Sequence, residues 1–99
     1  MSSYEYGYLL DEKTKVVIKA TRVPKDEDFK KGLKFSVSLL HLRKDEWTCV
    51  ARIDNHRHKG KRGLCHIHRE SDEREEYKDL TLKEAEETIN KISKNLSHE

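Results

Sequence analysis

Apolar and polar residues alternate along most of the first two thirds of this 99-residue chain. The alternation is cleanest in Leu33-Lys34-Phe35-Ser36-Val37-Ser38-Leu39, whose odd-numbered residues are all apolar. Because side chains two residues apart in a strand lie on the same face, this pattern predicts strands with one buried face. We predict about five strands, joined by short connections as an antiparallel meander, near residues 4–8, 16–23, 33–42, 47–53 and 63–68.

The spacing of the apolar residues changes after residue 80. Thr81-Leu82-Lys83-Glu84 has the form of a capping box, in which the threonine hydroxyl accepts a hydrogen bond from the glutamate amide. A single amphipathic helix must bury its apolar stripe against the sheet. The predicted fold class is therefore α+β, an antiparallel sheet over about 3–69 with one C-terminal helix over about 81–96 packed on one face. The apolar stripe, with steps of three and four residues, consists of Leu82, Ala85, Ile89, Ile92 and Leu96.

The length of the chain bounds its organisation. Ninety-nine residues, one third of them hydrophobic, make a single domain, 1–99, with one lean core. No apolar run approaches the ~20 residues of a membrane span, so we expect a cytoplasmic protein that has no membrane partner. Cys49 and Cys65 form no spacing motif, and we expect both thiols, like the side chain of Trp47, to be buried in the core.

Charge is distributed unevenly, although the formal net charge is only +2. Residues 52–69 hold six Lys/Arg against one acid, whereas residues 70–99 hold five Lys/Arg against ten acids. One concentrated basic segment in a weakly charged chain indicates a local site for an anion, and not a whole surface that coats nucleic acid.

The basic segment 52–69 also carries four of the six histidines. Imidazoles gain and lose protons near neutral pH, and here they stand among fixed positive charges. His66 and His68 are two residues apart, so we expect them on one strand face, about 7 Å from each other, with Cys65 and Ile67 facing the core. Neighbouring imidazoles of this kind can flank a scissile phosphate as base and acid.

RNA offers a concrete reaction for this pair. One neutral imidazole takes the proton of a 2′-OH, which attacks its own phosphodiester, and a protonated imidazole gives a proton to the departing 5′-oxygen. We assign base and acid to His66 and His68, and the orientation of one imidazole to Asp54, the one acid of the segment. Cations and amides nearby would bind the phosphate and the RNA. The residues expected to do so are Arg52, Asn55, Arg57, Lys61, Arg62 and Arg69.

Three other interpretations of the segment stay open. Its basic hairpin, 54–63, can be a solvated loop, or part of a nucleic-acid- or protein-binding module without catalysis. A metal site is the third interpretation. The surrounding lysines and arginines oppose a dication, so we expect no metal and no other cofactor. The ligands of such a site would be His56, His58, His66 and His68.

The order of these motifs is similar to that of a known family. From Leu33 onward the chain resembles the TumE-type toxins of prokaryotic toxin–antitoxin modules. The resemblance implies a small toxin that acts on RNA or translation and is neutralised by a helix-turn-helix antitoxin protein. The extra His56-Arg57-His58 departs from the family pattern and leaves open which histidine pair functions. The matching segments are Arg52-Ile53-Asp54-Asn55, Lys59-Gly60-Lys61, His66-Ile67-His68 and Leu80-Thr81-Leu82-Lys83-Glu84-Ala85.

Applied to this sequence, the resemblance points to Asp54, Asn55, His66 and His68 as site residues. The expected partners are therefore RNA and a helix-turn-helix antitoxin. An open sheet also leaves edge strands through which a homodimer can form.

Overall fold

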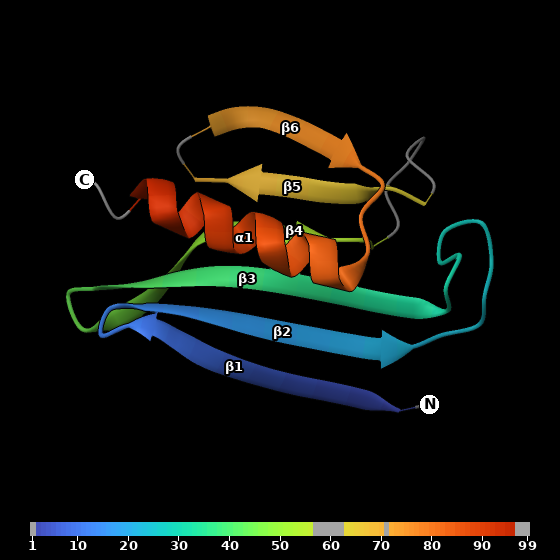
Figure 1. The fold of residues 1–99 in the computed structure, drawn as a ribbon, viewed down its shortest axis with the longest axis horizontal. Coiled ribbons are helices and arrows are strands. Elements are labelled where there is room, and N and C mark those ends of the chain that lie inside the picture. Colours follow the sequence, from blue (N-terminus) through green and yellow to red (C-terminus); the bar gives the residue numbers. More distant parts are fainter. Residues whose placement is uncertain (1, 57–62, 71, 97–99) are drawn as a thin grey trace.

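A computed structural model describes residues 2–56, 63–70 and 72–96 of the chain, without the side chains of 72–75 and 96. These residues form one antiparallel sheet crossed by one helix, α1 (Leu82–Leu96) (Figure 1). The strands are hydrogen-bonded in chain order, so the sheet is a meander and the α+β prediction is confirmed. Their bounds are β1 (Ser3–Asp11), β2 (Thr14–Arg22), β3 (Leu33–Arg43), β4 (Glu46–Asp54), β5 (Cys65–Arg69) and β6 (Asp72–Lys78).

Strand β6 extends the sheet beyond residue 69, where the predicted sheet ends. The strand reads Asp-Glu-Arg-Glu-Glu-Tyr-Lys, so it has no apolar face that a sequence pattern could reveal. It pairs antiparallel with β5, from Cys65 opposite Lys78 to Arg69 opposite Asp72. Charge is typical of an edge strand, because it discourages pairing with another chain. Among the described residues the sheet therefore has six strands, close to the predicted count of about five.

The hydrophobic core lies between α1 and one face of the sheet. The helix packs on β3 and β4 and contributes Ala85 and Ile89, both fully buried. Cys65 and Ile67 are buried on this side, as their alternation with the two histidines predicts. Burial of this apolar surface is the main contribution to folding. The central strands contribute Val16, Ile18, Ala20, Phe35, Val37, Leu39, Val50, Ala51 and Ile53.

The capping box begins α1 where the sequence predicts. The Glu84 amide donates a hydrogen bond to Thr81 Oγ1 at 3.1 Å, and the Thr81 amide donates to Glu84 Oε1 at 3.0 Å. These bonds satisfy amides that a helix N-terminus leaves without intrahelical partners. Leu80, just before the box, packs against the core and directs the chain from β6 onto the sheet.

A β-bulge in β4 changes which residues face the helix. Leu39 of β3 lies opposite Ala51, but the next residue of β3 lies opposite Cys49, so Val50 is an extra residue in β4. One extra residue reverses the alternation of side chains beyond it. Trp47 and Cys49, which strict alternation places with Ala51 in the core, are therefore exposed. The prediction that these two side chains are buried is wrong.

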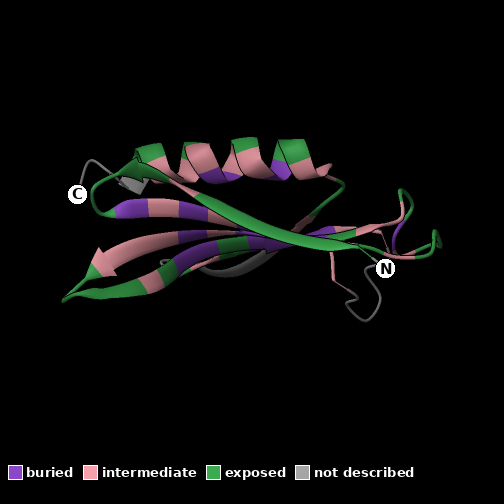
Figure 2. Cartoon of the chain, turned by 90° about the horizontal axis from the view of Figure 1, so that it is seen from below, coloured by how far each residue is buried: buried purple, intermediate pink, exposed green. Residues whose placement is uncertain are grey.

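The face of the sheet opposite α1 carries no second layer in the part of the chain that the structure describes (Figure 2). We refer to it as the open face. In the same described part, α1 is neither long enough nor apolar enough to cross a membrane.

Candidate functional site

Polar side chains from four neighbouring strands gather on the open face. Strand register places Ser36 of β3 opposite Asp54 of β4, Asp54 opposite His66 of β5, and His66 opposite Tyr77 of β6. Cross-strand partners have Cβ atoms about 4.5–5.5 Å apart, so each such row is a line of neighbouring side chains. The adjacent row consists of Ser38, Arg52 and His68. Together these residues form the polar rows of the open face.

The two histidines of β5 lie side by side in the polar rows. Their ring centroids are 6.1 Å apart and the rings are tilted by 45°, close to the separation of about 7 Å that strand geometry predicts. The ring of His66 is partly buried and stacks on Tyr77, with centroids 5.0 Å apart, and its Nε2 atom is buried. His68 is exposed, so it is the imidazole of this pair that solvent and ligand reach most directly.

Asp54 is buried, although it lies on the open face. Its Oδ2 is 3.5 Å from Nε of Arg52, and its Oδ1 accepts a hydrogen bond from the backbone amide of His56 at 3.1 Å. The ring Nδ1 of His56 lies 4.0 Å from the same Oδ1 atom. Through these contacts the Asp54 carboxylate holds the start of the basic hairpin to the end of β4. Strand β4 in turn pairs with β5, which carries His66 and His68.

Asn55 has a structural task that the sequence does not reveal. Its Oδ1 accepts a hydrogen bond from the Phe35 amide at 2.7 Å, and its Nδ2 donates to the Leu33 carbonyl oxygen at 2.7 Å. The side chain thus continues the pairing of β3 and β4 past the end of the strand. These bonds use the side-chain oxygen and one of the two amide hydrogens, so Asn55 holds β3 to the end of β4, and its contact with a phosphate stays a prediction.

The cations predicted to bind RNA are separated by the sheet. Arg52 is exposed on the open face, opposite His68. Arg69 lies on the helix face, opposite Ala51, and its Nη1 is 3.0 Å from Glu76 Oε1. Arg69 is therefore on the wrong side of the sheet to join His68 at one phosphate. The predicted residues Arg57, Lys61 and Arg62, together with His58, lie outside the described residues.

The Cys65 thiol is buried on the helix face and does not reach the polar rows. Burial raises the pKa of the Cys65 thiol to about 11, and its Sγ lies 3.4 Å from the Leu80 carbonyl oxygen. Among the described residues no three His, Cys, Asp or Glu side chains come together as a metal site. The metal interpretation included His58, which is not among the described residues, so that interpretation stays a prediction.

Residues of β2, β3 and β6 join the site in addition to the basic segment. Lys19 of β2 lies opposite Ser36 and extends the row, and Tyr77 closes it on the other side. The alternation in β3 could have placed Ser36 and Ser38 on the helix-free face. The alternation could not predict that Arg52 is the cross-strand partner of Ser38, because the register depends on pairing between segments that are distant in the sequence.

The candidate site therefore consists of the polar rows, in which imidazole, carboxylate, guanidinium and hydroxyl groups lie together on the open face. Comparisons of the chain with protein families, with curated proteins and with solved structures returned no match.

Proposed function

We propose that this chain acts on RNA, and that the imidazoles of His66 and His68 cleave a phosphodiester bound at the polar rows without a metal. One observation carries the proposal. Both imidazoles lie on the same uncovered face, 6.1 Å apart, with the guanidinium group of Arg52 on the residue directly opposite His68. Two imidazoles and a cation are the groups that cleavage next to a 2′-OH requires.

In the proposed reaction the neutral imidazole removes the 2′-OH proton, and the 2′-oxygen forms a bond to phosphorus. The P–O5′ bond breaks as the protonated imidazole donates its proton to the leaving 5′-oxygen. The products are a 2′,3′-cyclic phosphate and a 5′-hydroxyl, and the two imidazoles have exchanged protonation states. Arg52 stabilises the charge that develops on the phosphorane oxygens. Proton exchange with water restores the starting state.

RNA binding without cleavage is a second candidate function. It is favoured by the environment of His66, whose Nε2 atom is buried and whose ring stacks on Tyr77. In that case affinity depends on Arg52 more than on the histidines. It also falls steeply with salt, by a logarithmic slope of about 0.7 for each phosphate neutralised on a single strand.

The resemblance to TumE-type toxins supports the same target and adds a partner. On this basis we also propose that a helix-turn-helix antitoxin neutralises the chain. The measurement is whether such a protein, encoded beside this gene, forms a complex with the purified chain and stops its action on RNA.

The test of cleavage uses a mixed single-stranded RNA in excess EDTA. We expect the parent chain to leave 2′,3′-cyclic phosphate ends, with a rate that is bell-shaped against pH because one imidazole must be neutral and the other protonated. His68→Ala and His66→Ala should each lower the rate by about 10²- to 10⁴-fold. The matched control is His41→Ala, because His41 lies on the helix side of β3, 3.4 Å from Thr14 Oγ1.

The outcomes separate the two candidates. Full activity in the His66→Ala/His68→Ala double variant, or equal loss in His41→Ala, contradicts cleavage by this pair. RNA that is bound but left intact by the parent chain establishes the binding function instead. Circular dichroism of each variant shows whether a loss of activity comes from a loss of fold.

A further inference from the structure

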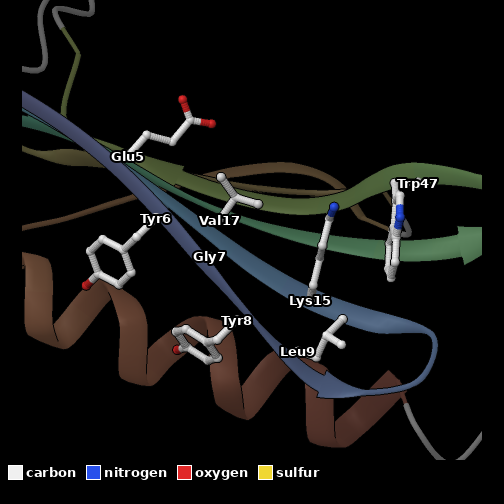
Figure 3. Close-up of a pocket in the computed structure, with 8 residues that line it drawn as sticks. All are labelled: Glu5, Tyr6, Gly7, Tyr8, Leu9, Lys15, Val17 and Trp47. Carbon is white, nitrogen blue, oxygen red and sulfur yellow. The ribbon is translucent and has the colours of Figure 1, made fainter.

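A hollow of about 490 Å³ lies on the open face, on the β1 side of the polar rows. Val17 of β2 lies at its floor and faces Gly7 of β1, which has no side chain to cover it. A Cβ atom at Gly7 would lie 2.9 Å from the Val16 carbonyl oxygen, so the backbone itself excludes a larger residue here. Figure 3 shows Glu5, Leu9, Lys15 and Trp47 around this floor, with the rings of Tyr6 and Tyr8 on the other side of β1.

The wall of the hollow is an exposed indole. The residue Trp47 is 38% exposed, and the ammonium group of Lys15 lies 4.3 Å from the centroid of its indole ring. A cation over an aromatic ring at an exposed site is a weaker interaction than a nucleobase stacked on the same ring. A base that enters the hollow can therefore displace Lys15 from the indole and leave its ammonium group beside the backbone phosphate.

Strand register connects the hollow to the polar rows. Val17 lies opposite Ser38, Ser38 opposite Arg52, and Arg52 opposite His68, so all four stand in one row across the sheet. Three strand spacings of about 4.8 Å separate the ends of this row by about 14 Å. A nucleotide chain that crosses the strands at right angles thus passes from the hollow to the histidine pair.

The charge of the open face suits such a chain. Basic side chains outnumber acidic ones among its described residues on β1 to β5, which favours a polyanion. The basic residues are Lys15, Lys19, Lys34 and Arg52, and the acidic residues are Glu5 and Asp54.

We propose that the hollow binds one nucleobase of single-stranded RNA, stacked on Trp47, while the backbone of the same strand runs over the polar rows toward Arg52 and His68. The inference rests on the proposed function, because it takes the polar rows as the phosphate site. A single strand is required, since the bases of a duplex are already stacked on one another and only an unpaired base can turn into a pocket.

The test uses a six-nucleotide 2′-O-methyl RNA, which has no free 2′-OH and so cannot be cleaved. Trp47 is the one tryptophan of the sequence, so its emission reports the hollow alone. We expect the oligonucleotide to quench this emission, and an abasic oligomer with the same phosphates to leave it unchanged. Binding of the labelled oligonucleotide, followed by fluorescence anisotropy, should weaken about 5- to 150-fold in Trp47→Ala.

Two variants keep this test specific. Trp47→Phe retains an aromatic ring and should recover most of the affinity. Tyr4→Ala removes another exposed aromatic ring, on the helix side of β1, and should leave the affinity unchanged. Because Trp47 is exposed, neither Trp47 variant is expected to unfold, and circular dichroism checks this.

The outcomes distinguish this inference from the proposed function. If the parent chain and Trp47→Ala bind the RNA equally, the nucleobase site is overturned while RNA binding at the polar rows stands. If the parent chain binds neither the RNA nor the abasic oligomer, both proposals fail. Loss of affinity in Trp47→Ala for the RNA but not for the abasic oligomer establishes the nucleobase site, whether or not cleavage occurs.

Discussion

The two faces of one sheet differ in what their side chains contact. The consecutive residues Arg52 and Ile53 of β4 show the difference most directly. Ile53 is fully buried beneath α1, whereas Arg52 is exposed on the open face beside Asp54. Folding free energy comes mainly from apolar surface removed from water, and exposed ion pairs add little to it. The helix face therefore holds the fold together, and the open face is left for polar groups that can serve a ligand.

The sharpest test of this division compares Ile53→Ala with Arg52→Ala. Removing most of the Ile53 side chain leaves a cavity under the helix, so we expect the free energy of unfolding to fall by about 2–5 kcal/mol. Arg52→Ala should change it by only about 1 kcal/mol, because the Arg52 side chain is 44% exposed and water screens its contact with Asp54. The buried Asp54 carboxylate also keeps its hydrogen bond from the His56 amide. Urea denaturation followed by circular dichroism measures both. A loss in Arg52→Ala as large as that in Ile53→Ala would contradict the division between the faces.

RNA binding should reverse the order of these two variants. Arg52→Ala is expected to weaken binding and to lower the logarithmic salt slope by about 0.7, the contribution of one phosphate contact on a single strand. Ile53→Ala should bind normally once the measurement is corrected for its unfolded fraction.

Sequence pattern predicts the helix face well, because its signals are local. Alternation in β3 and the Thr81–Glu84 capping box each depend on residues close together in the chain, and both are confirmed. The open face depends on register between distant segments. The extra residue Val50 moves Trp47 out of the core, and no local pattern marks it. The charged strand β6 lacks alternation altogether.

The candidate site shows the same limit. That His66 and His68 share a face follows from their spacing, and the structure agrees. The same rule could also have placed Arg69 on the helix face, because Arg69 is two residues from the buried Ile67 and shares its face. What Asn55 does could not be predicted, because both its hydrogen-bond partners belong to β3.

Asn55 gives the second test, because a structural role and an RNA contact predict different losses. Asn55→Ala removes hydrogen bonds to the Phe35 amide and the Leu33 carbonyl oxygen, so we expect a loss of about 1–3 kcal/mol in unfolding free energy. RNA affinity per folded molecule should stay the same. Thermal denaturation and anisotropy measure the two quantities. The matched control is Asn95→Ala on an exposed position of α1, which should not destabilise the chain. If Asn55→Ala instead keeps the parent stability and loses RNA affinity, Asn55 contacts the RNA and its structural role is contradicted.

A smaller effect is expected where the helix face begins. Thr81→Ala removes the acceptor of the Glu84 amide and should cost about 1 kcal/mol, typical of a lost N-cap. Thermal denaturation measures the loss, and Thr81→Ser, which keeps the hydroxyl, should recover most of it. Equal destabilisation by Ala and Ser would mean that the methyl group, and not the cap, matters.

Glu84 makes the same cap sensitive to acid. Hydrogen bonds from the backbone amide of Thr81, and then from the Thr81 side chain, hold the pKa of the Glu84 carboxyl below its usual value of 4.5. A carboxylate with a lowered pKa stabilises the folded state above 4.5, and this stabilisation is lost as the pH falls through the lowered value. We therefore expect Glu84→Gln to flatten the fall in melting temperature below pH 4.5. Glu87→Gln, on an exposed position of the same helix, should retain the parent slope.

The two cysteines test the comparison with almost no change to the fold. Cys49 is exposed on the open face beyond the β4 bulge, whereas Cys65 is buried on the helix face and burial raises its pKa to about 11. Because the thiolate is the reactive form, a disulfide reagent at about pH 8 should modify Cys49 and spare Cys65 until the chain is unfolded. Mass spectrometry of the labelled chain counts the modified thiols, and Cys49→Ser should remove the fast reaction entirely. Equal rates for both thiols in the folded chain would mean that water reaches the helix face as readily as the open face. In that case the stability differences expected for Arg52→Ala and Ile53→Ala would have to come from something other than burial.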